Sequence, residues 1–578
     1  MNGTEALNEA RDRLISLRTD YSAALESFEW PDVGDTFNFA HDWFDSYARG
    51  NDDPGLVIVE EDGTRNALTF GELADRSDQV AAQLREYGVG PGDAVVLMLG
   101  NQLELWESML GIIKLGAVLM PTTQAATTAE LIDRLDRGHA RAVICNTADA
   151  AKFAEVPGDY LRIVVGDSPE PGPEAPTGAP APAWLPYAAA YQRAPEPQPH
   201  PGNKTDDRVL LYFTSGTTSR PKLVEHTHYS YPVGHLATMY WLGLKPGDVH
   251  LNVSSPGWAK HAWSNFFAPF LAQATVFLYN YTRFDAAALL GVLEAEHVTS
   301  FCAPPTVWRM LINADLGAKP GSLREAIGAG EPLNPEVIKQ VEDNWGLTIR
   351  DGYGQTELTA SVANPPGQPV KAGSMGRPLP GVPVVLIDPY TNEVVEGVGE
   401  GEIAIDLSLP HPTLMTGYQG NPEKNAEAMA GGFYHTGDVA GRDDEGYISY
   451  IGRTDDVFKS SDYKVSPFEL ESVLIEHPAV VEAAVVPAPD PVRLAVPKAY
   501  LMLKDGVEPN AETARDILAF ARNALAPWLR VRRIEFADLP KTISGKIRRV
   551  ELRVRETEVA GQRPAGEFRD EDFPEIKG

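Results

Sequence analysis

Residues 212–228 read YFTSGTTSRPKLVEHTH and join an apolar strand to a loop of small residues and a lysine. Backbone N–H groups can wrap a polyphosphate only where side chains are small and backbone dihedrals permissive. The loop supplies such residues: Ser215, Gly216, Thr217 and Thr218. Lys222 adds a point charge, but Pro221 stands where the GxxxxGK[ST] pattern needs glycine. The stretch therefore predicts a phosphate-holding loop of a different kind.

The chain on either side of this loop alternates between apolar runs and amphipathic stretches. DAVVLML (93–99) and ATVFLY (274–279) have strand character, whereas LTFGELADRSDQVAAQLREYG (68–88) and ELWESMLGIIKLG (104–116) have helical spacing. Strands that alternate with helices predict a layered α/β domain.

The pattern of expected helices and strands changes twice in the second half of the chain. From about residue 370 to 450, short strands separated by turns predict a small β-rich subdomain, and residues 456–552 carry helix and strand patterns of their own. We therefore predict an α/β protein with a large N-terminal domain, residues 1–452, made of layered α/β subdomains plus the β-rich subdomain. A small, mobile α+β C-terminal domain, residues 453–578, follows it.

Composition excludes several classes of function. The 578 residues include 50 lysines and arginines against 81 aspartates and glutamates, a net charge of −31, which disfavours nucleic acid or an anionic membrane as the main partner. Cys145 and Cys302 are the two cysteines and support neither a disulfide framework nor a structural zinc site. No run of about 18 consecutive apolar residues is present. We expect a cytoplasmic protein without a membrane span.

Four further strings follow the first one in order. They are DGYGQTE (351–357), YHTGD (434–438), GRTDDVFKSSDYKVSPFELE (452–471) and LPKTISGKIRR (539–549). Together the five strings resemble the adenylate-forming superfamily of acyl-CoA synthetases, carrier-domain adenylation enzymes and luciferases. The medium-chain acyl-CoA synthetases are most similar, because their phosphate loop also continues after the lysine as it does here, with Leu223, Val224, Glu225 and His226.

The resemblance implies an ATP site in the N-terminal domain. Such an enzyme must neutralise charge on the transferring phosphate and the leaving pyrophosphate. Thr214, residues 215–218 and Lys222 would hold the β- and γ-phosphates. Three residues of DGYGQTE have implied roles: Tyr353 at the adenine face, Thr356 on the α-phosphate and Glu357 on Mg²⁺, a cation that prefers oxygen ligands.

The remaining nucleotide contacts are implied by other strings. Asp351 belongs to the same nucleotide site, Asp438 would accept the ribose hydroxyls and Arg453 would assist it. GAGEP (328–332) would form the adenine-side loop, through Gly330, Glu331 and Pro332.

The C-terminal strings imply catalysis and domain movement. Lys546 resembles the lysine that bridges the substrate carboxylate and the α-phosphate. Relatives swing the small domain about a hinge residue, here Asp455, so that one site serves adenylation and then thioester formation. Coenzyme A would pass close to the string after the hinge, at Ser461, Asp462 and Lys464.

The acyl pocket is implied at Trp258, Gly352 and Gly354. Acetate-specific relatives have a tryptophan where Gly354 stands, so the glycine is expected to leave room for a larger acyl group. Medium-chain, aromatic and polycyclic acids all satisfy that expectation. The histidines His226, His228 and His261 lack metal-ligand spacing and are interpreted as structural or wall residues.

Two departures from the family pattern leave open whether the protein catalyses both half-reactions. Ser219 and Asp462 each replace a glycine, the first where the backbone approaches pyrophosphate and the second on the pantetheine path. The leading hypothesis is an acyl-CoA ligase that uses a small-molecule carboxylic acid larger than acetate, together with ATP, Mg²⁺ and coenzyme A. The alternatives are an enzyme restricted to one half-reaction, or using an amine or carrier thiol, and a nucleotide-binding scaffold without turnover. Monomer and dimer both remain open.

Overall fold

The computed structural model describes the chain in nine stretches: residues 2–169, 183–214, 221–331, 333–389, 391–460, 463–490, 493–541, 547–559 and 562–577. Two compact units share these residues. The first comprises residues 1–214, 221–384 and 405–434, and the second consists mainly of residues 385–404 and 435–578. Within the described residues, no helix is both long and apolar enough to span a membrane.

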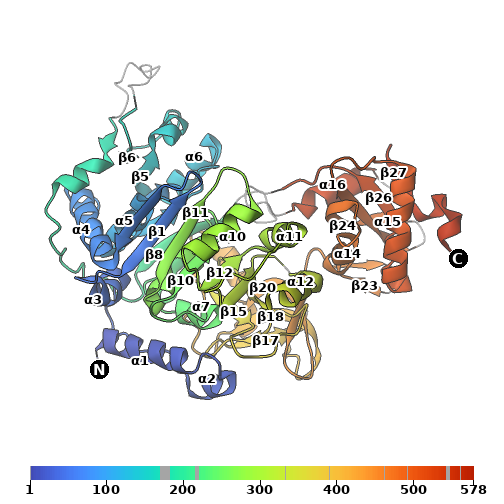
Figure 1. Cartoon of the computed structure of the whole chain (residues 1–578), viewed down its shortest axis with the longest axis horizontal. Coiled ribbons are helices and arrows are strands. Elements are labelled where there is room, and N and C mark those ends of the chain that lie inside the picture. The colour runs from blue at the N-terminus through green and yellow to red at the C-terminus, as the bar shows by residue number, and fades with distance from the viewer. Residues whose placement is uncertain are drawn as a thin grey trace. The chain divides into compact units, whose positions relative to one another are not determined.

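Two large, mostly parallel sheets organise the first unit (Figure 1). The nine-stranded sheet has the order β16-β15-β14-β13-β12-β10-β11-β1-β2, and its strands are β1 (Pro54–Glu60), β2 (Arg65–Thr69), β10 (Val249–Asn252), β11 (Thr275–Asn280), β12 (Ser300–Ala303), β13 (Glu325–Ala329), β14 (Ile349–Gly354), β15 (Ala360–Ala363) and β16 (Arg377–Pro378). The eight-stranded sheet has the order β19-β9-β8-β4-β3-β5-β6-β7, and its strands are β3 (Ala94–Met98), β4 (Val118–Pro121), β5 (Ala140–Asn146), β6 (Leu161–Val165), β7 (Leu185–Pro186), β8 (Arg208–Thr214), β9 (Lys222–Thr227) and β19 (Gly417–Tyr418).

Strand alternation shows how these sheets form layers. In β1, Leu56 and Ile58 join the central core between the sheets, whereas Val57 and Val59 join a second core on the outer face. The central core also takes in four helices: α4 (Phe70–Glu86), α5 (Leu103–Lys114), α7 (His235–Leu242) and α9 (Ala268–Ala272). Successive side chains of a strand point to opposite faces, so both sheets are buried on two sides. The predicted layered α/β architecture is confirmed.

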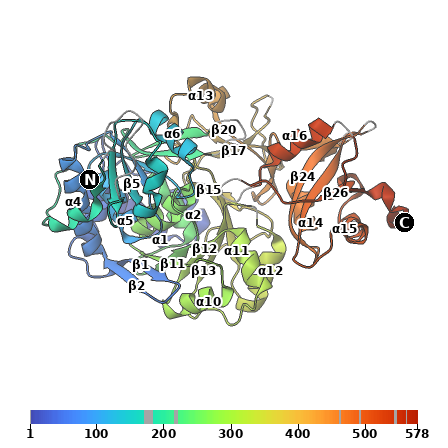
Figure 2. The same cartoon turned by 90° about the horizontal axis from the view of Figure 1, so that it is seen from above.

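Further helices cover the outer faces of the sheets. Three lie on the nine-stranded sheet (Figure 2), namely α10 (Ala286–Ala295), α11 (Pro305–Asn313) and α12 (Pro335–Trp345). The eight-stranded sheet is covered by α6 (Thr128–Arg137) and η2 (Thr147–Phe153). The shorter elements of this unit are α1 (Gly3–Ser16), α2 (Tyr21–Ser27), η1 (Phe39–Phe44), α3 (Asp45–Ala48), η3 (Tyr187–Gln192), α8 (Ala259–Ala262), η4 (Trp263–Phe267) and α13 (Pro422–Ala428).

The second unit contains two smaller sheets. One has the order β17-β18-β20-β21, with β17 (Val384–Ile387), β18 (Gly399–Asp406), β20 (Phe433–Arg442) and β21 (Ile448–Arg453). The other has the order β24-β25-β26-β27, with β24 (Val480–Asp490), β25 (Leu494–Leu503), β26 (Arg533–Phe536) and β27 (Glu567–Arg569). The hairpin of β22 (Phe458–Ser460) and β23 (Tyr463–Val465) precedes three helices, α14 (Pro467–Leu474), α15 (Ala511–Ala524) and α16 (Arg549–Val559). The β-rich subdomain and the α+β C-terminal domain are confirmed, and the mobility of the latter stays a prediction.

A buried ammonium group connects the elements of the C-terminal sheet. The Nζ atom of Lys498 in β25 lies 2.9 Å from Glu535, 2.7 Å from Glu556 and 2.8 Å from Glu567. Burial lowers the pKa of Lys498, but its hydrogen bonds to these three carboxylates outweigh burial and raise it. One cation thereby ties β25 to β26, α16 and β27. Removing the lysine from such a cluster would leave buried carboxylates without their shared cation, which destabilises the fold.

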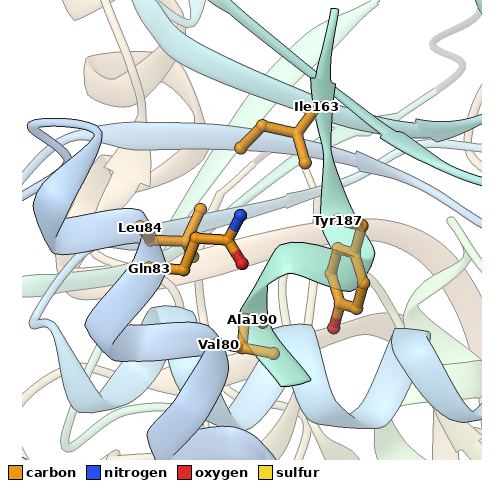
Figure 3. Close-up of a pocket in the computed structure, with 6 residues that line it drawn as sticks. All are labelled: Val80, Gln83, Leu84, Ile163, Tyr187 and Ala190. Carbon is orange, nitrogen blue, oxygen red and sulfur yellow. The ribbon is translucent and has the colours of Figure 1, made fainter. Parts of the chain in front are cut away.

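A small cavity lies where η3 packs on α4 (Figure 3). It has a volume of about 10 Å³ and is lined by Val80, Gln83, Leu84, Ile163, Tyr187 and Ala190. This volume is at the lower limit for one water molecule, and the cavity shares no residue with the predicted site.

Beside this cavity, α5 buries a carboxyl group. Glu107 is 1% exposed and accepts hydrogen bonds from Tyr191 Oη at 2.7 Å and Tyr187 Oη at 3.3 Å. Burial raises the pKa of Glu107 from its ordinary 4.5 to about 7, against the opposing effect of the Tyr191 hydrogen bond. The neutral form is therefore the one that the fold prefers.

This preference predicts a pH-dependent gain from Glu107→Gln. Because the folded-state pKa is raised, the stabilisation from Glu107 is full below pH 4.5 and is lost as pH rises through 7. Glutamine keeps the acceptor and does not titrate. We expect the free energy of unfolding to rise by about 3 kcal/mol at pH 8 and by less than about 1 kcal/mol at pH 5, measured by urea denaturation. A gain independent of pH would contradict this account.

Candidate nucleotide and acyl site

Strands β8 and β9 form the two arms of the predicted phosphate loop. They pair antiparallel, and Thr214 at the end of β8 lies opposite Lys222 at the start of β9. The chain therefore reverses direction between these two residues, as a phosphate-holding hairpin requires. The loop itself, with Ser215, Gly216, Thr217, Thr218 and Ser219, lies outside the described residues.

A tyrosine connects the predicted phosphate lysine to the predicted metal carboxylate. Lys222 Nζ donates to the hydroxyl of Tyr418 at 3.2 Å, and that hydroxyl donates to Glu357 Oε1 at 2.9 Å. The Lys222 ammonium also lies 4.8 Å from the centre of the Tyr418 ring. Tyr418 is 4% exposed, and its backbone is fixed by Asn425. Residues far apart in the sequence are thus brought into one polar cluster.

His226 fixes the turn that carries the QTE residues. Lys222 and His226 are four residues apart on β9 and so lie on the same face of the strand. The Nε2 atom of His226 donates to the carbonyl oxygen of Thr356 at 2.8 Å. Burial lowers the pKa of His226 to about 4, against the effect of this hydrogen bond, so the imidazole is neutral. The structural role expected for His226 is therefore specific: it positions the turn.

Strand β14 carries the first part of DGYGQTE. Tyr353 to Glu357 are half-buried, which leaves their side chains accessible to a ligand. Asp351 is buried, and its carboxylate accepts a hydrogen bond from the Gly352 N–H at 2.9 Å and another from the Leu333 backbone. Burial raises the pKa of Asp351 to about 8, although both hydrogen bonds lower it. Asp351 thus connects β14 to the segment that follows the predicted adenine loop.

The adenine loop begins directly after β13. Gly330 has φ +105°, and a side chain there would meet no atom within 4 Å, so this glycine leaves open space. Glu331 is half-buried and accepts a hydrogen bond from Thr306 at 3.4 Å. Pro332 lies outside the described residues.

In the second unit, the predicted ribose carboxylate is paired with its predicted partner. Asp438 in β20 lies opposite Arg453 in β21, and Arg453 Nη1 donates to Asp438 Oδ1 at 3.2 Å. Gly437 has φ +73°, and a Cβ atom there would lie 2.8 Å from Arg453 Nη2. The glycine of YHTGD thus permits both the backbone bend and the position of the arginine.

The predicted hinge lies beside this pair. Asp455 is 3.8 Å from Arg453 and 3.7 Å from Arg553 of α16, and the adjacent Asp456 pairs with Arg549 and Arg553. These ion pairs join the hinge to the helix that follows the predicted catalytic string. Ser461, Asp462 and Lys546 lie outside the described residues, as does the side chain of Lys464.

The acyl-pocket residues require one correction. A Cβ atom at Gly354 would lie 2.4 Å from the Thr359 carbonyl oxygen and 2.5 Å from Cη2 of Trp263, so the expected free space beside Gly354 is already occupied by another indole. Gly352 similarly abuts Trp241, with a Cβ distance of 2.4 Å. Trp258 is half-buried directly before α8.

The fit of Mg²⁺ can be judged from the available donors. In the described part of the chain, no group of three or more histidine, cysteine, aspartate or glutamate side chains is arranged to hold a metal ion. Mg²⁺ usually takes one or two carboxylates and completes its shell with substrate phosphates and water. The single carboxylate of Glu357, within two hydrogen bonds of Lys222, fits that type of site.

The Tyr418 bridge leads to a prediction for Tyr418→Phe. Loss of the hydroxyl removes the group that fixes Lys222 relative to Glu357, so KM for MgATP in pyrophosphate exchange should rise about tenfold. AMP affinity should be unchanged, because AMP lacks the β- and γ-phosphates. Tyr229→Phe is a matched control, since its hydroxyl donates to the Pro31 carbonyl at 3.2 Å. Equal weakening of ATP and AMP would show that Tyr418 has only a structural role.

Known proteins resemble this chain over most of its length. The sequence model described as "AMP-binding enzyme" matches residues 45–419, and that of the "AMP-binding enzyme C-terminal domain" matches residues 469–546. The chain is 42% identical to 4-hydroxybutyrate–CoA ligase 1 of Metallosphaera sedula over 546 residues, 93% of each chain. It is 34% identical to mitochondrial acyl-coenzyme A synthetase ACSM3 of Mus musculus, again over 93% of each.

A solved structure gives the same result for the fold. The anthranilate CoA ligase AuaEII in complex with anthranoyl-AMP matches with a TM-score of 0.79 at 28% identity, covering 91% of this chain and 98% of that one.

Proposed function

Because the chain belongs to the AMP-binding enzyme family, we propose that it is an AMP-forming acyl-CoA ligase. The carboxylate of an acid larger than acetate attacks the α-phosphorus of ATP, which gives acyl-AMP and releases pyrophosphate. The thiol of coenzyme A then attacks the acyl carbonyl, gives the thioester and releases AMP and a proton. The observation that carries the proposal is the Lys222–Tyr418–Glu357 cluster, in which a cation and a carboxylate suited to MgATP share one tyrosine.

The residues of the first unit have roles in adenylation. Thr214, the loop after it and Lys222 hold the β- and γ-phosphates, and Thr356 binds the α-phosphate from the turn that His226 fixes. Glu357 would hold Mg²⁺, which would neutralise phosphate charge. Tyr353 and the loop of Gly330, Glu331 and Pro332 enclose the adenine. The buried carboxyl group of Asp351 holds this loop against β14 through its hydrogen bond with the Leu333 backbone.

Residues of the second unit are assigned further roles in adenylation and in thioester formation. Asp438 accepts the ribose hydroxyls with Arg453 beside it, and Lys546 bridges the substrate carboxylate and the α-phosphate. We assign residues 1–452 to the N-terminal domain and residues 453–578 to the mobile domain, with the hinge residue Asp455 near the start of the latter. Ser461, Asp462 and Lys464 lie on the path of coenzyme A.

A direct assay tests this proposal. The purified protein is incubated with MgATP and a panel of carboxylic acids, with and without coenzyme A, and pyrophosphate, AMP and thioester are measured by mass spectrometry. We expect acid-dependent pyrophosphate release and a thioester that forms only with coenzyme A. Hydroxamate from added hydroxylamine without any thioester would favour an amine or carrier thiol as acceptor. Nucleotide binding with no turnover would favour the scaffold.

We also propose the cytoplasm as the compartment. Cys145 and Cys302 are both free and buried, which suits a reducing environment. Cell fractionation tests this assignment, and recovery in an oxidising compartment would overturn it.

A further inference from the structure

The last turn of α6 lies beside the strand that leads into the predicted phosphate loop. Phe213 in β8 is 6% exposed and packs in one core with apolar residues of α6. The guanidinium carbons of Arg134 and Arg137 lie 4.8 Å and 5.0 Å from the centre of the Phe213 ring, within the range of cation–π attraction. Phe213 directly precedes Thr214. The last turn of α6 is therefore fixed against the arm that enters the loop.

Arg137, the last residue of α6, also holds the arm that leaves the loop. Its Nη2 atom donates to the carbonyl oxygen of Pro221 at 2.8 Å. Proline has no N–H group, so this carbonyl is the one polar backbone group of Pro221. Pro221 directly precedes Lys222. The hydrogen bond therefore fixes the backbone from which the Lys222 side chain extends.

A second path joins Arg137 to the ammonium end of Lys222. The Nε2 atom of Gln419 donates to the Arg137 carbonyl oxygen at 3.1 Å, and the Gln419 N–H donates to the Leu223 carbonyl oxygen at 2.8 Å. Gln419 directly follows Tyr418, whose hydroxyl accepts a hydrogen bond from Lys222 Nζ. Arg137 is thus connected to both the backbone and the side-chain end of Lys222.

Asp133 holds the Arg137 side chain in the orientation that reaches Pro221. Arg137 Nε lies 2.9 Å from Asp133 Oδ1, and Nη2 lies 2.5 Å from Oδ2, which is a bidentate pair. Exposed pairs four residues apart on a helix contribute little to stability. These two side chains are only 29% and 27% exposed, and Nη2 serves Asp133 and Pro221 together. The pair therefore fixes the guanidinium in place.

From these contacts we infer that Arg137 is a positioning residue for ATP, which acts through Lys222 rather than on the phosphates themselves. This inference rests on the proposed ligase function and adds a residue that lies outside the five motif strings. A planar guanidinium can bind the Asp133 carboxylate and the Pro221 carbonyl together, whereas an ammonium group lacks this fork. Because Lys222 is assigned to the β- and γ-phosphates, the effect of Arg137 should be confined to nucleotides that carry them.

The test replaces Arg137 with methionine, which keeps an apolar stem and removes the donors. Isothermal titration calorimetry should show about tenfold weaker binding of MgATP. AMP binding and thioester formation from supplied acyl-AMP should be unchanged, because neither ligand has β- and γ-phosphates. Arg137→Lys should weaken MgATP binding nearly as much, since it keeps only the charge. Arg193→Met is the matched control: that side chain is 30% exposed and pairs with Glu86, so MgATP affinity should not change.

A double substitution tests whether Arg137 acts through Lys222. In Lys222→Met the ammonium that Arg137 positions is gone, so the addition of Arg137→Met should weaken MgATP binding further by only about threefold or less. An undiminished tenfold loss in that background would overturn the inference. Equal weakening of MgATP and AMP by Arg137→Met would reduce Arg137 to a structural role. Full recovery in Arg137→Lys would show that charge alone suffices, and would also overturn it.

The outcomes separate this inference from the proposed function. If the wild type releases pyrophosphate with an acid but Arg137→Met binds MgATP as tightly, the inference falls and the ligase function stands. Selective loss of MgATP binding in Arg137→Met, in a protein that releases no pyrophosphate with any acid, would overturn the ligase function and leave the positioning of ATP. A wild type that binds neither MgATP nor AMP would overturn both.

Discussion

Replacing Lys546 with alanine is expected to slow acyl-adenylate formation by about 10²–10³-fold and to leave acyl transfer from supplied acyl-adenylate to coenzyme A nearly unchanged. A cation that bridges the carboxylate and the α-phosphate acts mainly on the transition state of adenylation. In the second half-reaction the pyrophosphate has left, and the small domain is expected to present a different face. Pyrophosphate release measures the first step, and thioester formation from synthetic acyl-AMP measures the second.

The same string provides a matched control. Lys541 pairs with Glu482 at 2.6 Å, so Lys541→Ala removes an equal charge five residues away without touching the proposed bridge. After the string, α16 is fixed to the domain by Arg549, whose Nε donates to Glu471 Oε1 at 2.9 Å. A fold defect would therefore affect both half-reactions. Equal losses in both steps for Lys546→Ala would refute a role confined to one domain orientation.

The second large effect is expected for Asp438→Ala, which should weaken ATP and AMP binding by about 1.5–3 kcal/mol, or roughly 10- to 150-fold in Kd. Asp438 is 5% exposed and is already oriented by Arg453, and we expect its carboxylate to accept two ribose hydroxyls. Both nucleotides contain the ribose, and both should be affected equally. Isothermal titration calorimetry gives the two values.

Asp444→Ala controls for charge, because that carboxylate is exposed on the turn between the same two strands. If Asp438→Ala bound both nucleotides as tightly as the wild type, YHTGD would be a turn without a ribose contact.

The sequence was sufficient to predict the layers of the fold, whereas the groups expected to face the nucleotide stay a prediction. Alternation of apolar and polar residues indicates a strand that is buried on one face, whereas a continuous apolar run such as DAVVLML indicates a strand that is buried on both faces. Such runs, separated by helical stretches, predicted the α/β layers. The spacing of Lys222 and His226 on one strand could also have shown that both face the QTE turn, since strand side chains alternate with a period of two.

Contacts that depend on sheet order could not be predicted in this way. Tyr418 reaches Lys222 only because β19 pairs with β9, and the two strands are almost two hundred residues apart. Trp263 fills the space beside Gly354 from η4, an irregular helix that no local pattern specifies. Gly354 shows from the sequence alone that no side chain occupies this position. Only the structure shows that Trp263 fills the adjacent space.

The buried ammonium of Lys498 also constrains the order of events during protein synthesis. Two of its three carboxylate partners, Glu556 and Glu567, are translated 58 and 69 residues after it. Until they emerge from the ribosome, Glu535 is the one carboxylate of the three available to Lys498, so burying the ammonium would leave two of its three hydrogen bonds to carboxylates unmade. We infer that the C-terminal sheet closes late in translation, after residue 567, whereas the earlier domain can fold first. Proteolysis of ribosome-bound chains that end before and after this residue would reveal that order, and early protection of β25 would disprove it.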